Sequence, residues 1–451
     1  MRKICILFCL LTINCFSQNE FITVWKTYNV QPYNSITIPI TENTSPYTYV
    51  WEELDEEYNV ISSQSVSTTI PANNGPITIT FATPGIYRIK ISTDSSSFRF
   101  NNNGDQLGKD LIKVEQWGNI NWSSFANAFK SCTKLLAVNA TDVPILTNVH
   151  DLSYMFSNCN LAVFNDNINN WNVSNVINFE AMFINANNFN NSLDRWNTSS
   201  ATNLKKMFYN ANTFNQDIGS WDVSNVTNFN SMFCNAFQFN KHLEDWNTSS
   251  AVDMGYMFNN AHQFNQDINH FNVSLVEDFS YILKNTFNFN HKLTNWQTNS
   301  ITNGIGFFDN SGIDCINYSY TIASWTNNPN LPNNVTLGVL NIDYSFNIIT
   351  NINWLTTTKN WIFDNLSLQP DNTCTLNSTN FEKVSIKIYP NPTSDILNIE
   401  GLEVEKIDIY DAKGTLVQNT LNNNQVDVSN LSSGNYILII NDQHTEKIIK
   451  K

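Results

Sequence analysis

Residues 214–236 read FNQDIGSWDVSNVTNFNSMFCNA, and close copies of this stretch recur along the middle of the chain. The strings WNVSNV, WNTSSA, WDVSNV, WNTSSA, FNVSLV and WQTNSI begin at positions 171, 196, 221, 246, 271 and 296, a constant step of 25 residues. An apolar pair such as Met232-Phe233 follows each string, and two earlier pairs extend the series, so that eight units fit between about Trp122 and Asn310. Self-similarity at a fixed period is typical of a repeat protein.

Each unit has two halves with different apolar spacing. In WDVSNV, Trp221 and Val223 alternate with Asp222 and Ser224, which is the period of a half-buried strand. The following NFNSMFCNAFQF, residues 228–239, has its apolar side chains at helical spacing. A unit of this length cannot bury its own apolar face, but stacked neighbours can. We therefore predict a solenoid over residues 115–310, with strands along one side and short helices along the other.

The repeat is similar to one known family. The stretch at 214–236 resembles the repeat of BspA-like leucine-rich repeat surface proteins of bacteria, and AFxxCxxL, from Ala128 to Leu135, resembles the core of related repeats. The resemblance spans about residues 122–315. It implies a curved, right-handed α/β solenoid of the leucine-rich-repeat type and a surface interaction role that is often adhesive. It implies no catalytic chemistry.

The segments on either side of the repeats have other patterns. Residues 20–114 contain short strand patterns such as SITIPI, PITITF and YRIKIS, separated by turns. This segment resembles a polycystic-kidney-disease-type β-sandwich, although the acidic Trp-Gly-Asp-Gly turn of such domains is missing. Residues 311–380 depart from the period, and terminal repeats need an atypical cap. We predict a solenoid cap and linker there.

The last segment, residues 381–451, alternates apolar and polar residues and has glycines at its turns. It resembles the type A C-terminal sorting domain of type IX secretion, which is confined to Bacteroidetes and their relatives; an ordinary sandwich domain is the alternative. The resemblance implies an immunoglobulin-like β-sandwich, type IX secretion machinery as a partner, and removal of the domain after export. The sorting motif comprises Tyr389, Pro390, Asn391, Pro392, Gly414 and Gly434.

The first residues, MRKICILFCLLTINCFSQNE, have the pattern of a secretory signal peptide. A short positive region precedes about ten apolar residues, too few to span the bilayer as a helix. We predict a signal peptide over residues 1–17 with cleavage between Ser17 and Gln18, and a protein on the outer cell surface or in the extracellular space. A lipoprotein signal using Cys15 is the alternative. No other apolar stretch is long enough to cross a bilayer.

Composition excludes two classes of partner. The chain has 24 basic and 39 acidic side chains and a formal net charge of −15. Nucleic acids and anionic membrane surfaces bind clusters of Lys and Arg, so neither is expected as a partner. Aromatic residues make up 13% of the chain, which argues against wholesale disorder. We predict no transmembrane segment in the mature chain.

Five cysteines remain once the predicted signal peptide is removed, and none lies in a CxxC pair. In an oxidising compartment Cys315 and Cys374 could form a disulfide, since they bracket one segment. Cys132 and Cys159 occupy equivalent repeat positions and are expected to be buried, small residues. No spacing of Cys and His suggests a metal site, and no cofactor is expected.

No catalytic motif was found, and neither nucleophile, base nor paired carboxylates can be assembled from the repeats, so we expect no enzyme activity. The candidate binding residues are the outward positions of the predicted strands. They form either a ladder of hydrogen bonds between coils or a polar binding face. These positions are Asn172, Ser174, Asn197, Ser199, Asp222, Ser224, Asn247, Ser249, Asn272 and Ser274.

From these patterns we predict a secreted surface binding protein of the adhesin type, which recognises a protein or glycan. Two alternatives stay open. The protein could be an architectural component of the cell surface or matrix, or a non-catalytic carbohydrate-binding accessory of a polysaccharide-degrading system.

Overall fold

The structure is a computed structural model of the chain. It describes residues 19–28, 34–64, 66–102, 108–161, 163–364, 369–371, 374, 376, 387–400, 404, 406–411, 415–421, 423–441 and 444–451. The predicted signal peptide and its cleavage site at Ser17 and Gln18 lie outside the described residues, as does Gly414.

The N-terminal region is built from β-strands that pair antiparallel, except for β9 and β11, which pair in parallel. Four of them, β1, β4, β8 and β10, form the centre of an eight-stranded sheet, and shorter strands form a two-stranded sheet and a three-stranded sheet beside it. The strands are β1 (Glu20–Lys26), β2 (Ser35–Ile38), β3 (Ile40–Asn43), β4 (Tyr47–Leu54), β5 (Val60–Ser63), β6 (Thr68–Ile70), β7 (Ile77–Thr80), β8 (Ile86–Thr93), β9 (Phe98–Phe100), β10 (Leu111–Gln116) and β11 (Trp122–Ser124).

The large sheet continues directly into the first repeats. β10 pairs in parallel with β12 (Ala137–Val138), which pairs in parallel with β13 (Val163–Phe164). A short 3-10 helix, η1 (Asp166–Asn170), follows β13. The sheet therefore bridges the predicted boundary between residues 114 and 115.

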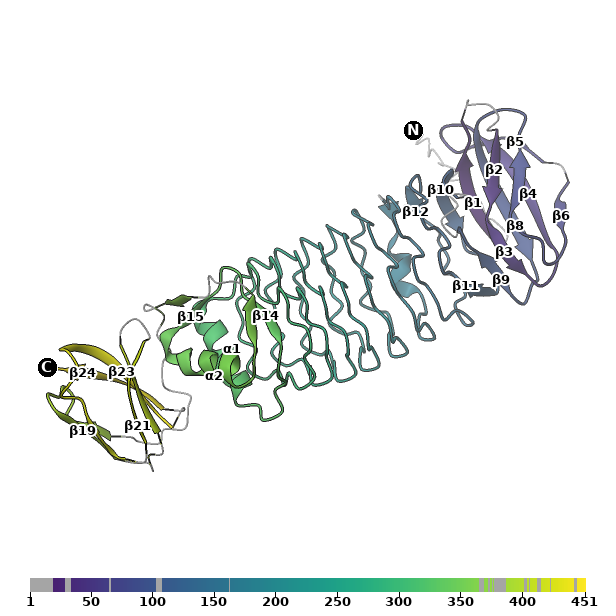
Figure 1. Cartoon of the computed structure of the whole chain (residues 1–451). Coiled ribbons are helices and arrows are strands. Elements are labelled where there is room, and N and C mark those ends of the chain that lie inside the picture. The colour runs from purple at the N-terminus through teal and green to yellow at the C-terminus, as the bar shows by residue number, and fades with distance from the viewer. Residues whose placement is uncertain are drawn as a thin grey trace, which may run out of the picture.

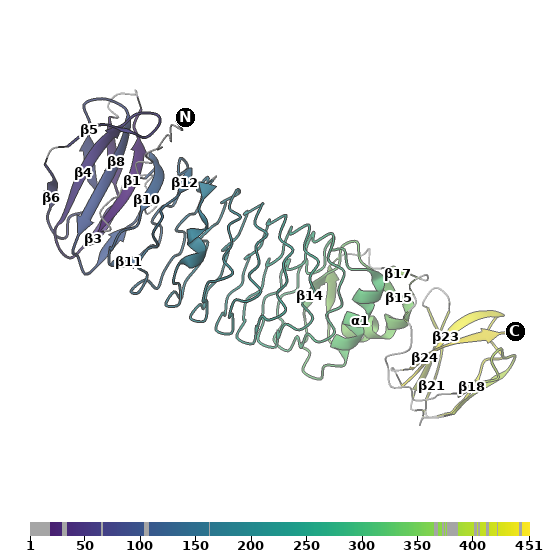
Figure 2. The ribbon, with the colours of Figure 1, turned by 180° about the vertical axis from the view of Figure 1, so that it is seen from behind.

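Residues from about 122 to 310 form coils of chain that lie side by side, as Figures 1 and 2 show from opposite sides. Isolated parallel bridges join equivalent residues of successive coils, from Asp151–Asn178 to Asp278–Asn303. Within 171–310 the chain forms turns, without helices or extended strands. The described residues contain only two α-helices, both after the last repeat, and their strands form several small sheets. The predicted multidomain fold, with an α/β solenoid of strand-plus-helix units at its centre, is therefore wrong.

The backbone of residues 228–239 shows why no helix forms there. Ser231 and Asn235 have φ values of 57° and 60°, whereas a right-handed helix needs φ near about −63°. Alternate N–H groups donate to the next coil: Phe233 N donates to Met257 O at 2.9 Å, and Asn235 N donates to Asn259 O at 2.8 Å. The N–H groups between them close turns within the coil. Such turns bring apolar residues inward at nearly the spacing of a helix.

A segment with helices follows the last coil. Gly304 pairs with β14 (Thr336–Gly338), and Trp325 of α1 (Cys315–Thr326) donates its indole N–H to Leu293 O at 3.0 Å. A disulfide joins Cys315 at the start of α1 to Cys374, with 6.3 Å between their Cα atoms. The other elements are β15 (Asp343–Ser345), η2 (Phe346–Ile348), α2 (Ile349–Thr357), β16 (Ile362–Asp364) and β17 (Gln369–Asp371).

The C-terminal region consists of two small antiparallel sheets. One has the order β18-β19-β22 and the other β21-β20-β23-β24, and apolar side chains from both form one core. The strands are β18 (Lys387–Tyr389), β19 (Ile396–Glu400), β20 (Lys406–Tyr410), β21 (Leu416–Leu421), β22 (Gln425–Asp427), β23 (Gly434–Ile440) and β24 (His444–Lys450).

Candidate functional site

The predicted outward row lies on the surface of the coils, and its Asn and Asp side chains form hydrogen bonds within their own coil. Asn197, Asp222 and the equivalent Asn side chains are exposed, and the Ser side chains two residues later are half-buried. Asp222 Oδ1 accepts from Ser224 N at 3.0 Å and from Ser224 Oγ at 2.6 Å. The same contact with the backbone N–H two residues on recurs at Asn172, Asn197, Asn247 and Asn272.

These contacts are Asx-turns, in which a short side chain oxygen fixes its own turn. The Ser224 hydroxyl and backbone N–H hold the pKa of the Asp222 carboxyl below its usual value. The Asn and Asp side chains of the row therefore shape the loop of each coil, and the row contributes to links between coils through backbone carbonyls such as Asp222 O, which accepts from Thr198 Oγ1 at 2.9 Å. The side-chain ladders between coils are made by other residues.

The most regular ladder runs through asparagines that the sequence analysis did not single out. Asn235 Nδ2 donates to Asn210 Oδ1 at 2.6 Å, and Asn260 Nδ2 donates to Asn235 Oδ1 at 2.6 Å. All members have positive φ, a conformation that Asn tolerates better than other residues with side chains. An Asn three residues after each Met232-like position was the signal for this ladder. Its members are Asn158, Asn185, Asn210, Asn235, Asn260, Asn285, Asn310 and Asn341.

The tryptophan of each repeat forms a second link between coils. Trp246 Nε1 donates to Ile218 O of the preceding coil at 3.0 Å, and Trp221 and Trp296 make the equivalent bond. One coil has Phe271 at this position, which has no N–H. There His270 Nε2 lies 3.0 Å from Leu243 O, the equivalent acceptor. The neighbouring histidine thus replaces the missing donor.

The alternation of VSNV and TSSA units has a structural counterpart. Asn225 Nδ2 donates to Ser199 O at 2.9 Å, whereas Ser250 Oγ donates to Ser224 O at 2.6 Å. Both types of unit therefore make a hydrogen bond to the preceding coil, with a different side chain in each.

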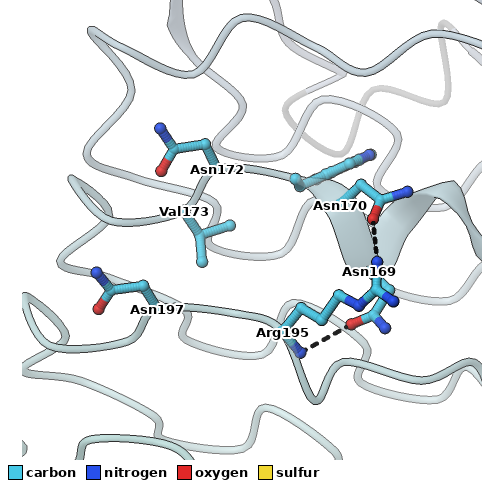
Figure 3. A pocket seen from close by; sticks show the side chains of 7 residues that line it. Asn169, Asn170, Asn172, Val173, Arg195 and Asn197 are labelled. Carbon is cyan, nitrogen blue, oxygen red and sulfur yellow. Dashed lines mark hydrogen bonds between the residues drawn. The ribbon is translucent and has the colours of Figure 1, made fainter.

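A shallow hollow of about 320 Å³ lies on the predicted row between its first two coils. Figure 3 shows Asn172 and Asn197 on adjacent coils with Val173 between them, and Arg195 reaching towards Asn170. Arg195 Nη1 donates to Asn170 Oδ1 at 3.2 Å. Among the described residues, no partner accepts from the Nδ2 groups of Asn172 and Asn197.

Arg195 gives this hollow a positive charge. The equivalent positions in other coils are Asn170, Ser220, Asp245, His270 and Asn295, so a permanent cation faces the surface at this register only here. The sequence analysis missed it, although a departure from the repeat consensus was visible. Amide groups and one guanidinium can donate to and accept from hydroxyl, carbonyl or amide groups of a ligand. In the described part of the chain, no three His, Cys, Asp or Glu side chains gather in a way that could hold a metal ion.

The remaining cysteines are buried thiols. Burial raises the pKa of Cys132 and Cys159 well above the usual value, and that of Cys234 to about 12. The Cys159 thiol donates to Phe129 O at 2.9 Å. Such thiols are poor nucleophiles because they stay protonated.

Part of the predicted sorting motif, residues 390–392, lies in an exposed loop against the last strand. Asn391 Nδ2 donates to Lys447 O at 2.7 Å, and Asn391 Oδ1 accepts from Ile449 N at 2.9 Å. Thr393, which the sequence analysis did not include, is buried and bonds to Ile449 and Lys451. Tyr389 donates its hydroxyl to Glu400, Pro390 and Pro392 are exposed, and Gly434 begins β23 opposite Lys450. These hydrogen bonds attach the loop that contains Asn391 and Thr393 to β24.

The comparison with known families gave two matches. Residues 123–236 and 213–325 match the family described as "Mycoplasma protein of unknown function, DUF285". Residues 387–451 match the secretion system C-terminal sorting domain. No curated protein and no solved structure matched the chain. In the described residues, no helix has the length and apolar character needed to cross a membrane. The chain thus carries a type IX secretion sorting domain behind repeats of the DUF285 family, which indicates export to the cell surface or the extracellular space.

Proposed function

We propose that this exported protein is a non-enzymatic binding protein of the adhesin type, which recognises an extracellular protein or glycan through the exposed loops of its repeat coils. The hollow at Asn172, Asn197 and Arg195 carries the proposal. It combines two exposed amide Nδ2 groups that have no acceptor among the described residues with the one guanidinium of its register.

Three further points support the proposal. The similarity of the repeats to those of BspA-like leucine-rich repeat surface proteins favours a role in surface interaction. The sorting domain favours a site of action outside the cell, after removal of the signal peptide and of the sorting domain itself. The chain has a net charge of −15, so Arg195 is a local positive charge on an acidic protein. Its guanidinium would orient a ligand with a carbonyl or carboxylate group.

The test is a binding screen of the full chain against glycans, matrix proteins and itself. The variants Asn172→Asp and Asn197→Asp remove the amide donors but keep the turn, because Asp222 accepts the same bonds in its own coil. We expect the double variant and Arg195→Ala to weaken a specific ligand at least tenfold. The matched control Asn247→Asp with Asn272→Asp makes the same change on coils away from the hollow.

Equal loss in the control would show that the hollow is not the site. Concentration-dependent self-association without any other ligand would favour the alternative of an architectural surface or matrix protein. Polysaccharide binding by the full chain that is lost when exposed residues of 20–114 are substituted would favour a carbohydrate-binding accessory.

A further inference from the structure

A second surface feature lies on another register of the coils. Phe237, His262 and Phe287 occupy equivalent positions of three successive coils. The rings of Phe237 and His262 stack with their centroids 4.8 Å apart, and the ring of Phe287 lies against that of His262 at 4.9 Å, tilted by 34°. We call these three side chains the aromatic ridge. In the two preceding units the same register holds Asn187 and Asn212.

The ridge ends in an open ring. Phe287 is 54% exposed, the largest value for an aromatic side chain among the described residues. One coil further on, the register is occupied by Gly312, where a Cβ would lie only 2.1 Å from Phe287 O. The close approach of the two coils requires glycine, and glycine leaves the ring without a neighbouring side chain from that coil. An exposed aromatic ring that packs on nothing beyond it is a site for a ligand with its own flat apolar face.

The surroundings of the ridge are amides. Gln238, Gln263 and Asn288 follow the three ridge residues in sequence and are exposed, and Asn288 Nδ2 donates to Gln263 Oε1 at 3.1 Å. Nearer the N-terminus, the equivalent rows and the asparagine ladder together line a hollow of about 340 Å³, which includes Asn158, Asn185, Asn187 and Asn188. These three registers therefore border one another on one face.

The chemistry of this face selects the class of ligand. None of the three registers carries Lys, Arg, Asp or Glu from the coil of Asn185 to that of Phe287, so these registers favour a neutral ligand over a charged one. A ridge of three rings is also far smaller than the roughly 800 Å² that each partner contributes to a stable protein interface. A pyranose sugar fits both features, since its C–H face packs on the negative face of an aromatic ring and its hydroxyls bond to amides.

We propose that the aromatic ridge is a binding site for a neutral oligosaccharide, which stacks a sugar ring on Phe287 and bonds to the flanking amides. This inference deepens the proposed function, since it names a ligand class for a surface binding protein. It uses a face distinct from the hollow at Arg195, so the two can succeed or fail separately.

The experiment is calorimetric titration of the full chain with four neutral probes: cellohexaose, laminarihexaose, mannohexaose and N-acetylchitohexaose. We expect at least one to bind, with an affinity that hardly depends on salt, and we expect Phe287→Ala to weaken it at least tenfold. Phe287 is largely exposed, so the variant should fold. Tyr256→Ala is the matched control, because Tyr256 is 37% exposed and stacks on Tyr281 in another register.

Failure of all four probes to bind overturns the proposal. Equal weakening by Tyr256→Ala, or affinity that falls steeply with salt, does so too. Asn172→Asp with Asn197→Asp separates the two sites, because it alters the hollow and leaves the ridge intact. Loss of hexaose binding in that variant would move the sugar site to the hollow, and so would overturn the ridge and support the proposed function.

Discussion

The repeat region and the sorting domain at residues 387–451, here called the sorting module, bury their apolar side chains in different ways. One continuous core runs from Phe21 in β1 through every coil to Trp361, whereas the sorting module has a core of its own around Ile407 and Ile409. The repeats are held by side-chain ladders and ring stacks between coils, and the module by strands paired along most of their length. Stability in the first region should therefore depend on contacts between neighbouring coils, and it should be independent of the second.

Tryptophan fluorescence can separate the two regions. All 12 tryptophans precede residue 387, so none lies in the sorting module. A change in tryptophan emission during urea unfolding therefore reports only on the continuous core.

The largest effect is expected from Phe233→Ala. Phe233 is fully buried, with its ring centroid 5.9 Å from that of Phe208, 5.7 Å from that of Phe258 and 3.9 Å from that of Phe239. Truncating such a ring leaves a cavity and costs about 3–5 kcal/mol. The free energy of unfolding measured by tryptophan fluorescence should fall by this amount. The matched control is Ile409→Ala in the sorting module, which should leave the tryptophan transition unchanged; a shift there would show that the two cores are coupled.

A smaller effect is expected at the asparagine ladder, where substitution by alanine should destabilise the protein more than substitution by glycine. Asn235→Ala loses both side-chain ladder bonds, each worth about 1 kcal/mol. It also places alanine at a φ of 60°, which costs about a further 1–2 kcal/mol. Asn235→Gly loses the same bonds without the backbone strain.

We therefore expect Asn235→Ala to lower the free energy of unfolding by about 3 kcal/mol and Asn235→Gly by about 2 kcal/mol. In a helix interior the order is reversed, because glycine is less favourable than alanine by about 1 kcal/mol. Urea titrations of the two variants thus distinguish a left-handed turn from the helix that the sequence suggested. Greater destabilisation by glycine would contradict the turn.

The repeat period and its buried positions could be predicted, because equivalent side chains of stacked units face the same core. Trp221, Val223, Met232 and Phe233 are buried as their spacing indicated. The helix could not be excluded from this spacing, since tight turns with inter-coil hydrogen bonds bring residues inward at a similar interval. The Asn that recurs at the position of Asn235 in every unit after the first was the local signal for a left-handed turn.

The candidate site was predictable only in part. The row of Asn172 and Asp222 is exposed, as an outward row must be, but its Asx-turns could not be distinguished from strand positions by alternation alone. Arg195 and Phe287 could not be found from the residues that the units have in common, because both depart from the repeat consensus. In a repeat protein the shared residues specify stacking, so exposed departures are the better guide to binding.

The tryptophan link permits a rescue experiment. Trp246→Phe removes the indole donor to Ile218 O and leaves that carbonyl with the Trp221 N–H, at 3.2 Å, as its donor, so the loss of one hydrogen bond should cost about 1 kcal/mol. The coil with Phe271 solves the same problem through His270, and Asp245 occupies the equivalent position before Trp246. Adding Asp245→His to Trp246→Phe should therefore restore most of the lost free energy of unfolding, with Asp245→His alone as the control. Equal stability of the single and double variants would show that His270 does not replace the indole.

The smallest effect concerns the loss of repeat stability at acid pH. Hydrogen bonds from Ser224 lower the pKa of Asp222 in the folded state, below the unfolded value of about 3.9. The carboxylate therefore contributes stability above pH ~4, which is lost as the pH falls through the folded pKa. Asp222 is exposed, so solvent screening limits the contribution to about 0.5 kcal/mol.

Asp222→Asn should keep the turn, because Asn172 accepts the equivalent bonds from Ser174 with an amide oxygen. We expect this variant to match the parent protein at pH 7 and to lose slightly less stability between pH 5 and pH 3, as measured by urea titration with tryptophan emission. The sorting module does not contribute to that signal, so the difference isolates one turn of the repeats. If the variant and the parent protein lose the same stability between pH 5 and pH 3, the Ser224 contacts stabilise the carboxylate and the protonated carboxyl group of Asp222 equally.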